Sequence, residues 1–496
     1  MKKLGLMLLL AVAMVFVSCK DETGDVFTMI PADANYVAAI DGGGIIKKAG
    51  IKIENGEVVF PDSYKSLFDK ALSAKDREEM AAIADAGIDF DRKMYFFGTN
   101  DYEGVLIVPI SDSDAFKAFW EKNADADMVS DGELYKMSDG NDIAYLSAHH
   151  LVYASPAPSV EESTAEAYLK ELITNGFKAS IKDNADAMEM LDSNADMSFY
   201  GNYGKILEIS GGKTAITAMY GEAFSEYINS IRGMGGTLSF NKQDIDITFK
   251  GFIDENDVTK QYEAVLGDPS ADGLKFIPAD MQLVFLGSIK GEELMKIDVF
   301  NTLLDNVKDN PYITKEELKE YIAGIDGPLT IGGNYTNYII NRASIPQIYG
   351  ALKTSKADEM CGKLQAGING LGLIACTKVG DEYVVNISSE CAVAFGSKDG
   401  FFYFRTSGPK VTESMYDDDF ARGIFESVPG AAYMNLRKGS SANTVLKSML
   451  PGLQFSAYLK GETIDNRTSS IKLVVEEPEG NNVIETLLSI VANSGI

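Results

Sequence analysis

The chain contains few of the residues from which metal sites and nucleophilic catalytic sites are built. It has two histidines, four cysteines and one tryptophan among 496 residues. The histidines, His149 and His150, are neighbours in a strand-like run, so their rings would point to opposite faces of a sheet and could not readily share one metal ion. The cysteine spacings are not those of zinc sites, and the H-E-x-x-H, G-x-S-x-G and P-loop motifs are missing from the sequence. We therefore expect no catalytic residue, no metal ion and no cofactor.

Positive charge is also scarce. The chain has 45 Lys and Arg against 73 Asp and Glu, which gives a formal net charge of −28 at pH 7. The acids are spread along the whole chain rather than gathered in a tail, which is typical of a solubilising surface. A field of this sign repels nucleic acids and anionic membrane surfaces. We therefore expect no nucleic-acid partner.

Long hydrophobic runs are missing beyond the first residues. The run Leu4–Val17 follows two lysines and has 14 residues, too few for a helix to span a bilayer, which takes about 20. A basic start, a short apolar run and a small residue before the cut predict a signal peptide over residues 1–18. The end of the run, Val17-Ser18-Cys19, resembles a bacterial lipobox, with Phe16 where Leu is commonest. The resemblance implies that Cys19 carries lipid and becomes the N-terminus; the alternative is an ordinary secretory signal with Cys19 as a free thiol.

The residues after this cysteine suggest a destination. Cys19 is followed by Lys20, Asp21 and Glu22, which resembles the Lys-then-acidic export tag of surface lipoproteins in Bacteroides-like bacteria. The resemblance implies a protein that is held in the outer membrane by the lipid on Cys19 and faces the cell exterior. The alternative is that residues 19–26 form only a solvated tether, because charged residues and Gly keep a linker unfolded.

The three remaining cysteines are an odd number, so at least one thiol cannot pair within the chain. Cys361 lies in a helical pattern, whereas Cys376 and Cys391 lie in strand-like runs. We predict three thiols that pack as small apolar side chains. A cross-strand disulfide between Cys376 and Cys391 is the alternative.

The sequence also repeats itself over a long distance. Ile30-Pro31-Ala32-Asp33 recurs 247 residues later as Ile277-Pro278-Ala279-Asp280, and each copy is followed by an apolar run and then by a helical pattern. Ordered recurrence indicates a duplicated architecture, although short apolar motifs also recur by chance. We predict two tandem duplicated units, 27–267 and 274–496, joined near 268–273.

Alternating strands joined by tight turns and separated by helices predict an α+β fold with mainly antiparallel sheets and packed helices. Asp399-Gly400 is expected to form a hairpin turn, because Gly tolerates positive φ. Gly291–Leu304 is expected to form one helix. Tyr338–Ser344 is expected to be the second-half counterpart of a strand over Gly104–Ile110.

Three large side chains are expected in the core. Tyr36 and Leu283 hold the same place after the two repeated motifs, and strand alternation predicts that both are buried. Trp120 lies in a helical pattern with Phe116 and Phe119, which indicates a core position. An exposed aromatic platform for glycans is the alternative for aromatic residues, and the sequence does not signal one.

Glycine-rich and acidic stretches are the remaining candidates for ligand binding. Asp41-Gly42-Gly43-Gly44 approaches a phosphate cradle, but it lacks the full glycine spacing and a strand-to-helix turn is the preferred interpretation. Asp125, Asp127 and Asp131 alternate as calcium ligands do, without the glycine of an EF-hand loop. Asp417-Asp418-Asp419 is best explained as the first turn of a helix, where the helix dipole favours acids, with Ca²⁺ binding as the alternative.

The opening of the predicted mature chain resembles an uncharacterised family, a domain of unknown function, of Bacteroides-type outer-membrane lipoproteins of similar length. The likeness rests on Ile30-Pro31-Ala32-Asp33-Ala34, on Tyr36-Val37 and on Lys47-Lys48-Ala49-Gly50 in the helical pattern that follows. This resemblance brings no activity, ligand or catalytic residue.

The favoured hypothesis is a surface-tethered lipoprotein of the bacterial outer membrane that acts as a non-enzymatic binding or scaffold protein. Its membrane contact is the lipid on Cys19, and its ligand is a glycan or a protein. The alternative is a glycan-active envelope hydrolase that uses Asp and Glu carboxylates, but 73 acids offer too many pairs to assign one from sequence.

Overall fold

The computed structural model describes residues 25–54, 57–124, 127–139, 142–220, 222–308, 312–340, 345–389, 391–449, 455–476, 478 and 480–494. The predicted signal peptide (1–18), the lipidation site Cys19 and the tag residues Lys20, Asp21 and Glu22 lie outside the described residues. Their predicted roles therefore stay predictions.

The described chain forms two compact units. Unit 1 consists of the residues up to Ser210, of Arg232–Phe252 and of the residues from Pro478 onward, and unit 2 consists of Gly211–Ile231 and Ile253–Glu477. These units interleave in the sequence, whereas the predicted boundaries, 27–267 and 274–496, are contiguous. The difference arises because a segment before Arg232 packs with unit 2 and the C-terminal helix packs with unit 1.

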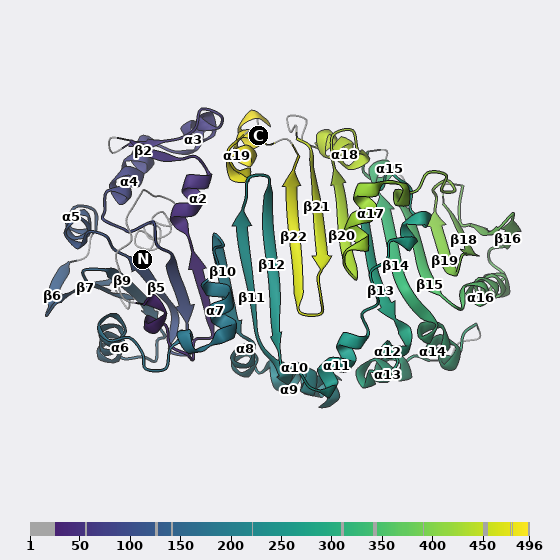
Figure 1. Cartoon of the computed structure of the whole chain (residues 1–496), viewed down its shortest axis with the longest axis horizontal. Helices are drawn as coiled ribbons and strands as arrows, with labels where there is room; N and C mark the ends of the chain where they lie inside the picture. Colours follow the sequence, from purple (N-terminus) through teal and green to yellow (C-terminus); the bar gives the residue numbers. More distant parts are fainter. Residues whose placement is uncertain are drawn as a thin grey trace. The chain divides into compact units, whose positions relative to one another are not determined.

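Unit 1 is an antiparallel sheet with helices packed against it (Figure 1). Its strands are β1 (Tyr36–Ile40), β2 (Lys52–Glu54), β3 (Glu57–Val59), β4 (Met94–Gly98), β5 (Tyr102–Pro109), β6 (Met128–Asp131), β7 (Leu134–Asp139), β8 (Asp142–Leu146), β9 (His150–Pro156), β10 (Met197–Asn202), β11 (Ile231–Phe240) and β12 (Asp244–Ile253). Its helices are η1 (Val26–Met29), α2 (Gly42–Lys48), α3 (Lys65–Ala71), α4 (Ala74–Ala84), α5 (Ser113–Asn123), α6 (Glu162–Thr174), η2 (Ile181–Asp183), α7 (Ala185–Leu191), α8 (Tyr203–Ile209) and α19 (Val483–Ser494).

The strands of unit 1 pair in the order β11-β10-β1-β4-β5-β9-β8-β7-β6. β11 continues into β12 through a tight turn in which the Asn241 N–H donates to the Asp244 carbonyl at 2.8 Å. β2 and β3 form a separate hairpin. Each of these pairings is antiparallel, as the alternating sequence pattern predicts.

Unit 2 is likewise built on antiparallel strands. Its strands are β13 (Leu283–Lys290), β14 (Ile325–Asn334), β15 (Gln347–Thr354), β16 (Cys376–Val379), β17 (Glu382–Asn386), β18 (Ala392–Lys398), β19 (Phe401–Thr406), β20 (Gly430–Leu436), β21 (Ala457–Thr463) and β22 (Thr468–Val475). Its helices are α9 (Gly212–Tyr220), α10 (Glu222–Ser230), α11 (Asp257–Ala264), η3 (Asp272–Phe276), α12 (Gly291–Leu294), α13 (Asp298–Asp305), α14 (Lys315–Ala323), α15 (Thr336–Ile340), α16 (Ala357–Gly370), η4 (Met415–Asp417), α17 (Asp419–Glu426) and α18 (Ser441–Met449).

The strands of unit 2 pair in the order β22-β21-β20-β13-β14-β15-β19-β18-β17-β16. This order corresponds to that of unit 1, since β13 pairs with β14 and β20 just as β1 pairs with β4 and β10. The prolines of the repeated motif also correspond: Pro31 forms a bridge with Ser180, and Pro278 forms one with Ser414. Both units are thus α+β with antiparallel sheets, and their origin by duplication stays a prediction.

The prediction that Tyr36 and Leu283 are buried is wrong, because both are only half-buried and their neighbours Val37 and Val284 are the buried residues. Val37 belongs to the core cluster of unit 1 that also contains residues of helices α6 and α7. On the opposite face of the strands, Phe96 is 39% exposed. The prediction placed the wrong face of these strands in the core, because both faces carry apolar side chains and the sequence alternation does not distinguish them.

Two expected elements differ from the structure. Gly291–Leu304 is not one helix, because Ile297 adopts an extended conformation between α12 and α13 and is buried. Tyr338–Ser344 is not the counterpart of the first-half strand: the described part of it, up to Ile340, is helical in α15, and the strand is β15, which starts after Pro346. Proline lacks an N–H for the ladder and is usually found at a strand's start or outside it.

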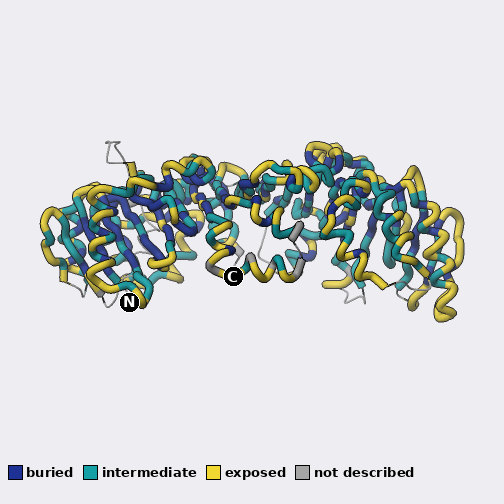
Figure 2. The backbone as a smooth tube through the Cα atoms, turned by 90° about the horizontal axis from the view of Figure 1, so that it is seen from below, coloured by how far each residue is buried: buried dark blue, intermediate teal, exposed yellow. Residues whose placement is uncertain are grey.

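The Asp399-Gly400 turn is confirmed. It joins β18 to β19, and both residues have positive φ, 54° and 76°. Buried residues, dark blue in Figure 2, lie mainly on the strands, and many residues of the helices are exposed, yellow in Figure 2. Trp120 is part of the core of unit 1, as predicted.

Among the helices of the described ranges, none has the length and apolar character that crossing a membrane would require.

Candidate functional site

The histidine pair is divided between core and surface, as expected. His149 is exposed and His150 is 6% exposed. Burial, and then the charge of Arg92, lower the pKa of His150 to about 4, and the Arg92 Nη2 lies 3.4 Å from the imidazole Nε2. A neutral, buried ring beside a guanidinium is a core group, whereas the ring of His149 is exposed.

The glycine-rich turn before α2 does not form a phosphate cradle. The side chain of Asp41 caps the helix and accepts a hydrogen bond from the Gly44 N–H at 2.7 Å. A carboxylate therefore already lies at the N-terminus of α2, where a phosphate would have to bind. The interpretation as a strand-to-helix turn is confirmed.

The acidic candidates are used for local structure. Asp131 pairs with Lys170 at 2.6 Å, and the hydrogen bond from Lys170 lowers the pKa of Asp131. Asp127 is exposed, and Asp125 lies outside the described residues. In the stretch 417–419, Asp418 caps α17 by accepting from the Phe420 N–H at 3.0 Å, as the helix-turn interpretation predicts.

The thiols at Cys361, Cys376 and Cys391 are free, so the alternative of a Cys376–Cys391 disulfide is wrong. Cys361 and Cys376 are buried, and Cys391 is half-buried. Burial raises the pKa of Cys361 to about 11 and also raises that of Cys376. These two thiols are therefore poor nucleophiles at neutral pH. Within the described ranges, no group of three or more His, Cys, Asp or Glu side chains is placed to hold a metal ion.

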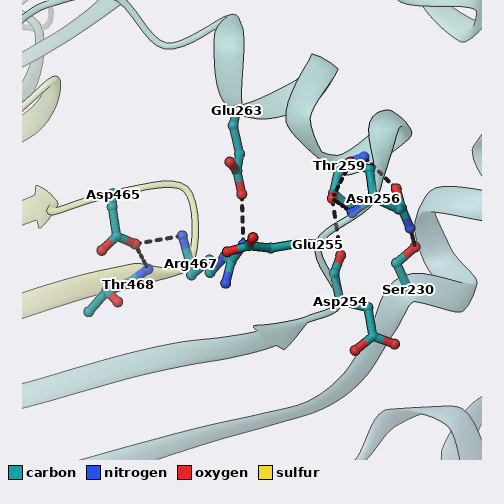
Figure 3. Close-up of polar contacts among 9 residues, drawn as sticks. All are labelled: Ser230, Asp254, Glu255, Asn256, Thr259, Glu263, Asp465, Arg467 and Thr468. Carbon is teal, nitrogen blue, oxygen red and sulfur yellow. Dashed lines mark hydrogen bonds and ion pairs between the residues drawn. The ribbon is translucent and has the colours of Figure 1, made fainter.

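A polar cluster in unit 2 surrounds Arg467, in the turn between β21 and β22 (Figure 3). Its guanidinium lies 2.9 Å from Glu263 of α11 and 3.6 Å from Glu255. The hydrogen bond from Arg467 is the main cause that lowers the pKa of Glu263. Asp465 closes the turn by accepting from the backbone N–H groups of Arg467 and Thr468, both at 2.7 Å.

The same cluster fixes the start of α11. Asn256 caps the helix by accepting from the Thr259 N–H at 2.9 Å, and its amide donates to the Ser230 Oγ at 2.6 Å (Figure 3). The charges of Arg467, Glu255, Glu263 and Asp465 each meet a partner within the cluster, and these contacts tie the hairpin to α11. We interpret the cluster as structural.

The feature with the character of a ligand site lies around helix α16. Asp358 and Glu359 occupy its first turn, where the helix dipole favours acids. Cys361 and Ile368 pack against Val385 and Phe395 of the sheet, a spacing of seven residues that keeps them on one face of the helix. Its C-terminal end is fixed to the start of β16.

That fixation comes from one side chain. The amide of Asn369 accepts from the Cys376 N–H at 2.7 Å and donates to the Cys376 carbonyl at 3.2 Å. These two hydrogen bonds hold the end of α16 at the start of β16. Space is left on both sides of the helix.

The first space, cavity A, lies between α14, α16 and strands β14 and β15, and has a volume of about 430 Å³. Its lining consists of Tyr312, Ile313, Leu318, Tyr321, Ile322, Ile325, Leu352, Met360, Lys363, Leu364, Gly367, Ile368 and Leu371. Most of these side chains are hydrocarbon. The volume is in the range of small-molecule pockets, about 300–1,000 Å³.

The second space, cavity B, lies between α16 and strands β17, β18 and β19, and has a volume of about 440 Å³. Its lining is entirely apolar: Leu364, Ile368, Leu371, Leu373, Ile374, Val385, Ile387, Val393, Phe395, Phe402 and Phe404. Leu364, Ile368 and Leu371 therefore line both cavities. Leu373, at the rim, is 83% exposed, and exposed apolar surface of this kind marks interaction sites.

Polar groups lie at the edge of cavity A. Lys363 pairs with Glu317 of α14 at 2.5 Å, and this pairing lowers the pKa of Glu317 and raises that of Lys363. Glu317 also completes the capping box with Thr314 that starts α14. The ion pair thus joins the two helices that bound the cavity.

Sequence reasoning missed this site, since it placed no candidate residue between Cys361 and Cys376. One signal was available: the apolar positions of α16 continue past its end into Leu371-Gly372-Leu373-Ile374. A helix whose apolar stripe continues into an apolar loop has more apolar surface than packing on one face of a sheet can bury. The other walls of cavity A come from residues of α14, β14 and β15 and from Tyr312 and Ile313, which precede α16 in the chain and have no local signature.

Comparison with known proteins gives a family and no activity. A family model described as "Domain of unknown function (DUF4836)" matches residues 27–448, and no curated protein matches.

The solved structures that resemble the chain do so only weakly. Crystal form III of TP0453 is 11% identical, with 48% of this chain and 85% of that chain covered and a TM-score of 0.28. Form I of TP0453 is 10% identical, covers 48% and 84%, and has a TM-score of 0.27. The DNA polymerase III β subunit of Thermotoga maritima is 8% identical, covers 89% and 99%, and has a TM-score of 0.11. Similarity at this level carries no argument about this chain.

Proposed function

The chain belongs to the DUF4836 family, whose function is unknown, and we propose that it is a lipid-anchored, non-enzymatic binding protein of the cell envelope that holds an apolar ligand beside α16. The observation that carries the proposal is the pair of hydrocarbon-lined cavities that share Leu364, Ile368 and Leu371. Apolar space of this size next to exposed leucines costs stability unless something fills it.

A hydrocarbon chain is the ligand that such walls favour. Each buried methylene contributes about 0.8 kcal/mol, or about a fourfold gain in affinity. Octanoic, decanoic and dodecanoic acids should therefore bind with affinities that rise by about that factor per methylene. The test uses the chain from Lys20 to Ile496, which keeps every described residue, and measures displacement of a dansyl-labelled undecanoic acid.

Two glycines of α16, one in the lining of cavity A and one outside it, test whether the ligand binds in cavity A. Gly367 lines the cavity, and a Cβ there would lie 3.5 Å from the Tyr312 side chain, an ordinary contact, so Gly367→Leu adds hydrocarbon to the cavity wall without a clash at Cβ. Gly362 is exposed, and a Cβ there meets nothing within 4 Å. Both substitutions raise helix propensity equally. Only Gly367→Leu should therefore weaken the binding of dodecanoic acid, by about tenfold or more.

Three results would contradict the proposal. These are no displacement by any of the three acids, no dependence of affinity on chain length, or equal effects of the two leucine variants. Turnover of a glycan by the purified protein, abolished by one Asp or Glu substitution, would favour the hydrolase alternative instead.

We also propose that Cys19 carries the lipid anchor and that Lys20, Asp21 and Glu22 direct the protein to the outer face of the outer membrane. The support is the signal-peptide pattern and the acidic tag in the sequence. Cys19→Ser should abolish fatty-acid labelling and leave the precursor uncleaved. Alanines at 20–22 should keep the lipid but remove accessibility to external protease; unchanged surface digestion of intact cells would refute the tag.

A further inference from the structure

The connection from a strand to a helix is built alike in the two units. In unit 1, the N–H of Ser111 donates to the carbonyl of Gly87 at 2.9 Å. In unit 2, the N–H of Ser355 donates to the carbonyl of Gly324 at 3.0 Å. Ser111 follows β5 and precedes α5, and Ser355 follows β15 and precedes α16. Because these contacts match, residues at the same distance from the two serines hold equivalent positions in α5 and α16.

The fifth and ninth residues after the serine are core aromatic residues in unit 1. They are Phe116 and Trp120, which are 3% and 6% exposed. Their rings are stacked, with centroids 6.2 Å apart. Both belong to a core cluster that also contains Met80 and Ile83 of α4. Two aromatic rings thus contribute to the core that α4 and α5 share.

In unit 2 the same two positions are walls of cavity A. They are Met360 and Leu364, which line the cavity. Leu318 and Ile322 of α14 line it as well. The side chains of methionine and leucine are smaller than those of phenylalanine and tryptophan, so two rings' worth of packing is only partly replaced. An apolar space that is left open in this way costs stability until something fills it.

The lining of cavity A offers little to a polar head group. Among its described residues, Lys363 and two tyrosines carry the nitrogen and oxygen atoms of the side chains. Lys363 pairs with Glu317 at 2.5 Å, the Tyr321 hydroxyl is shielded from solvent, and Tyr312 is 39% exposed. A head group inside the cavity would lose its hydration and gain few partners, which is unfavourable. The polar end of a ligand is therefore more stable in water.

Building on the proposed function, we infer that cavity A holds one hydrocarbon chain in the place that Phe116 and Trp120 take in unit 1, and that the polar end of the ligand stays outside. Met360 and Leu364 are then the residues that keep the site open. The ligand class is a single-chain amphiphile that is recognised by its chain and not by the charge of its head group.

Three ligands with the same decyl chain test the role of the head group. Undecanoic acid, decan-1-ol and decylamine place a carboxylate, a hydroxyl and an ammonium on that chain. The test uses the Lys20–Ile496 chain and the dansyl-labelled probe in about 0.15 M salt, which screens the charge of the protein. Because the same hydrocarbon is buried, the three affinities should agree within about threefold. A preference of about tenfold or more for one head group would overturn the inference and leave the proposed function standing.

Substitutions in α16 test whether the chain takes the place of the rings. Met360→Phe and Leu364→Trp each introduce the aromatic residue of the equivalent position in unit 1. Each should weaken all three ligands by about tenfold or more, because the ring fills space that the chain needs. Ala366→Trp is the control, since Ala366 is exposed and lines neither cavity. It should bind all three ligands like the parent.

Thermal unfolding without ligand shows whether the variants keep the fold. The added rings should keep or raise the midpoint, because they cover apolar surface. If Leu364→Trp lowers the midpoint by several degrees, Met360→Phe, the smaller change, provides the test. If a folded variant binds all three ligands as tightly as the parent while Gly367→Leu weakens them, the ligand lies elsewhere in cavity A and the inference is wrong. If the parent binds none of the three, the proposed function fails and this inference fails with it.

Discussion

At the scale of single residues, His150 has the clearest consequence for stability. Its pKa is about 4 in the folded protein and about 6.5 in an unfolded chain. As pH falls, the unfolded state binds the proton first, so the stabilisation is complete above about pH 6.5 and is lost between about 6.5 and 4. The full loss is about 3 kcal/mol.

His149 and His150 form a matched pair for testing this. His150→Gln should remove the acid-induced loss of stability over that window, whereas His149→Gln, at the exposed neighbour, should leave it unchanged. Urea unfolding between pH 4 and 8 measures the difference. Identical pH dependence of the two variants would show that His150 is not kept neutral by burial.

At the scale of elements, glycine is favourable at one position and unfavourable at another. It is favourable in the hairpin turn between β18 and β19 and unfavourable inside helix α16. Gly400 has φ of 76°, a conformation that other L-residues adopt at a cost. Its nearest neighbour for a Cβ is the flexible end of Lys353 at 3.2 Å, so the backbone decides the effect. Gly362 lies in the interior of α16 with open space around it.

The effect of a Gly→Ala substitution on the free energy of unfolding should therefore have opposite signs at the two sites. We expect Gly400→Ala to lower the free energy of unfolding by about 1 kcal/mol and Gly362→Ala to raise it by up to about 1 kcal/mol. Chemical denaturation of the two variants beside the parent is sufficient. Stabilisation by Gly400→Ala would contradict the assignment of the positive-φ turn.

At the scale of the whole molecule, the strands of the two units pair in corresponding orders, and each unit has one buried valine at the equivalent place. Val37 is 1% and Val284 0% exposed. A buried carboxylate without a partner costs several kcal/mol. Val37→Asp should therefore unfold unit 1, and Val284→Asp should unfold unit 2.

Each of these variants is the control for the other. Hydrogen exchange followed by mass spectrometry should show loss of protection mainly in the peptides of the substituted unit. If either substitution removes protection from both units equally, the two do not unfold independently and the chain is one cooperative body. Units that unfold separately would be consistent with the predicted duplication.

Much of the local structure could be predicted from neighbouring residues. The turn at Asp399-Gly400 follows from backbone conformations open to glycine, and the acids at 417–419 were placed at a helix start by the helix dipole. The α+β class followed from alternating runs and short turns. Local chemistry decides these features, so they need no knowledge of distant contacts.

The errors occurred where one local pattern fits two structures. Tyr36-Val37-Ala38-Ala39-Ile40 is apolar at every position, so the sequence does not show which face of the strand is buried, and only the tertiary packing of the core that contains Val37 decided it. At Ile297 the helical pattern is interrupted by an extended residue whose side chain is buried.

The sequence alone determined where strands turn and where helices are capped, because these depend on residues within a few positions of one another. It also contains the signal-peptide pattern and the acidic charge. The candidate site was decided only by the tertiary structure. Tyr321, Leu352 and Gly367 line one cavity because α14 and α16 pack beside β15, and an unfilled space between packed elements depends on volumes that no segment encodes by itself.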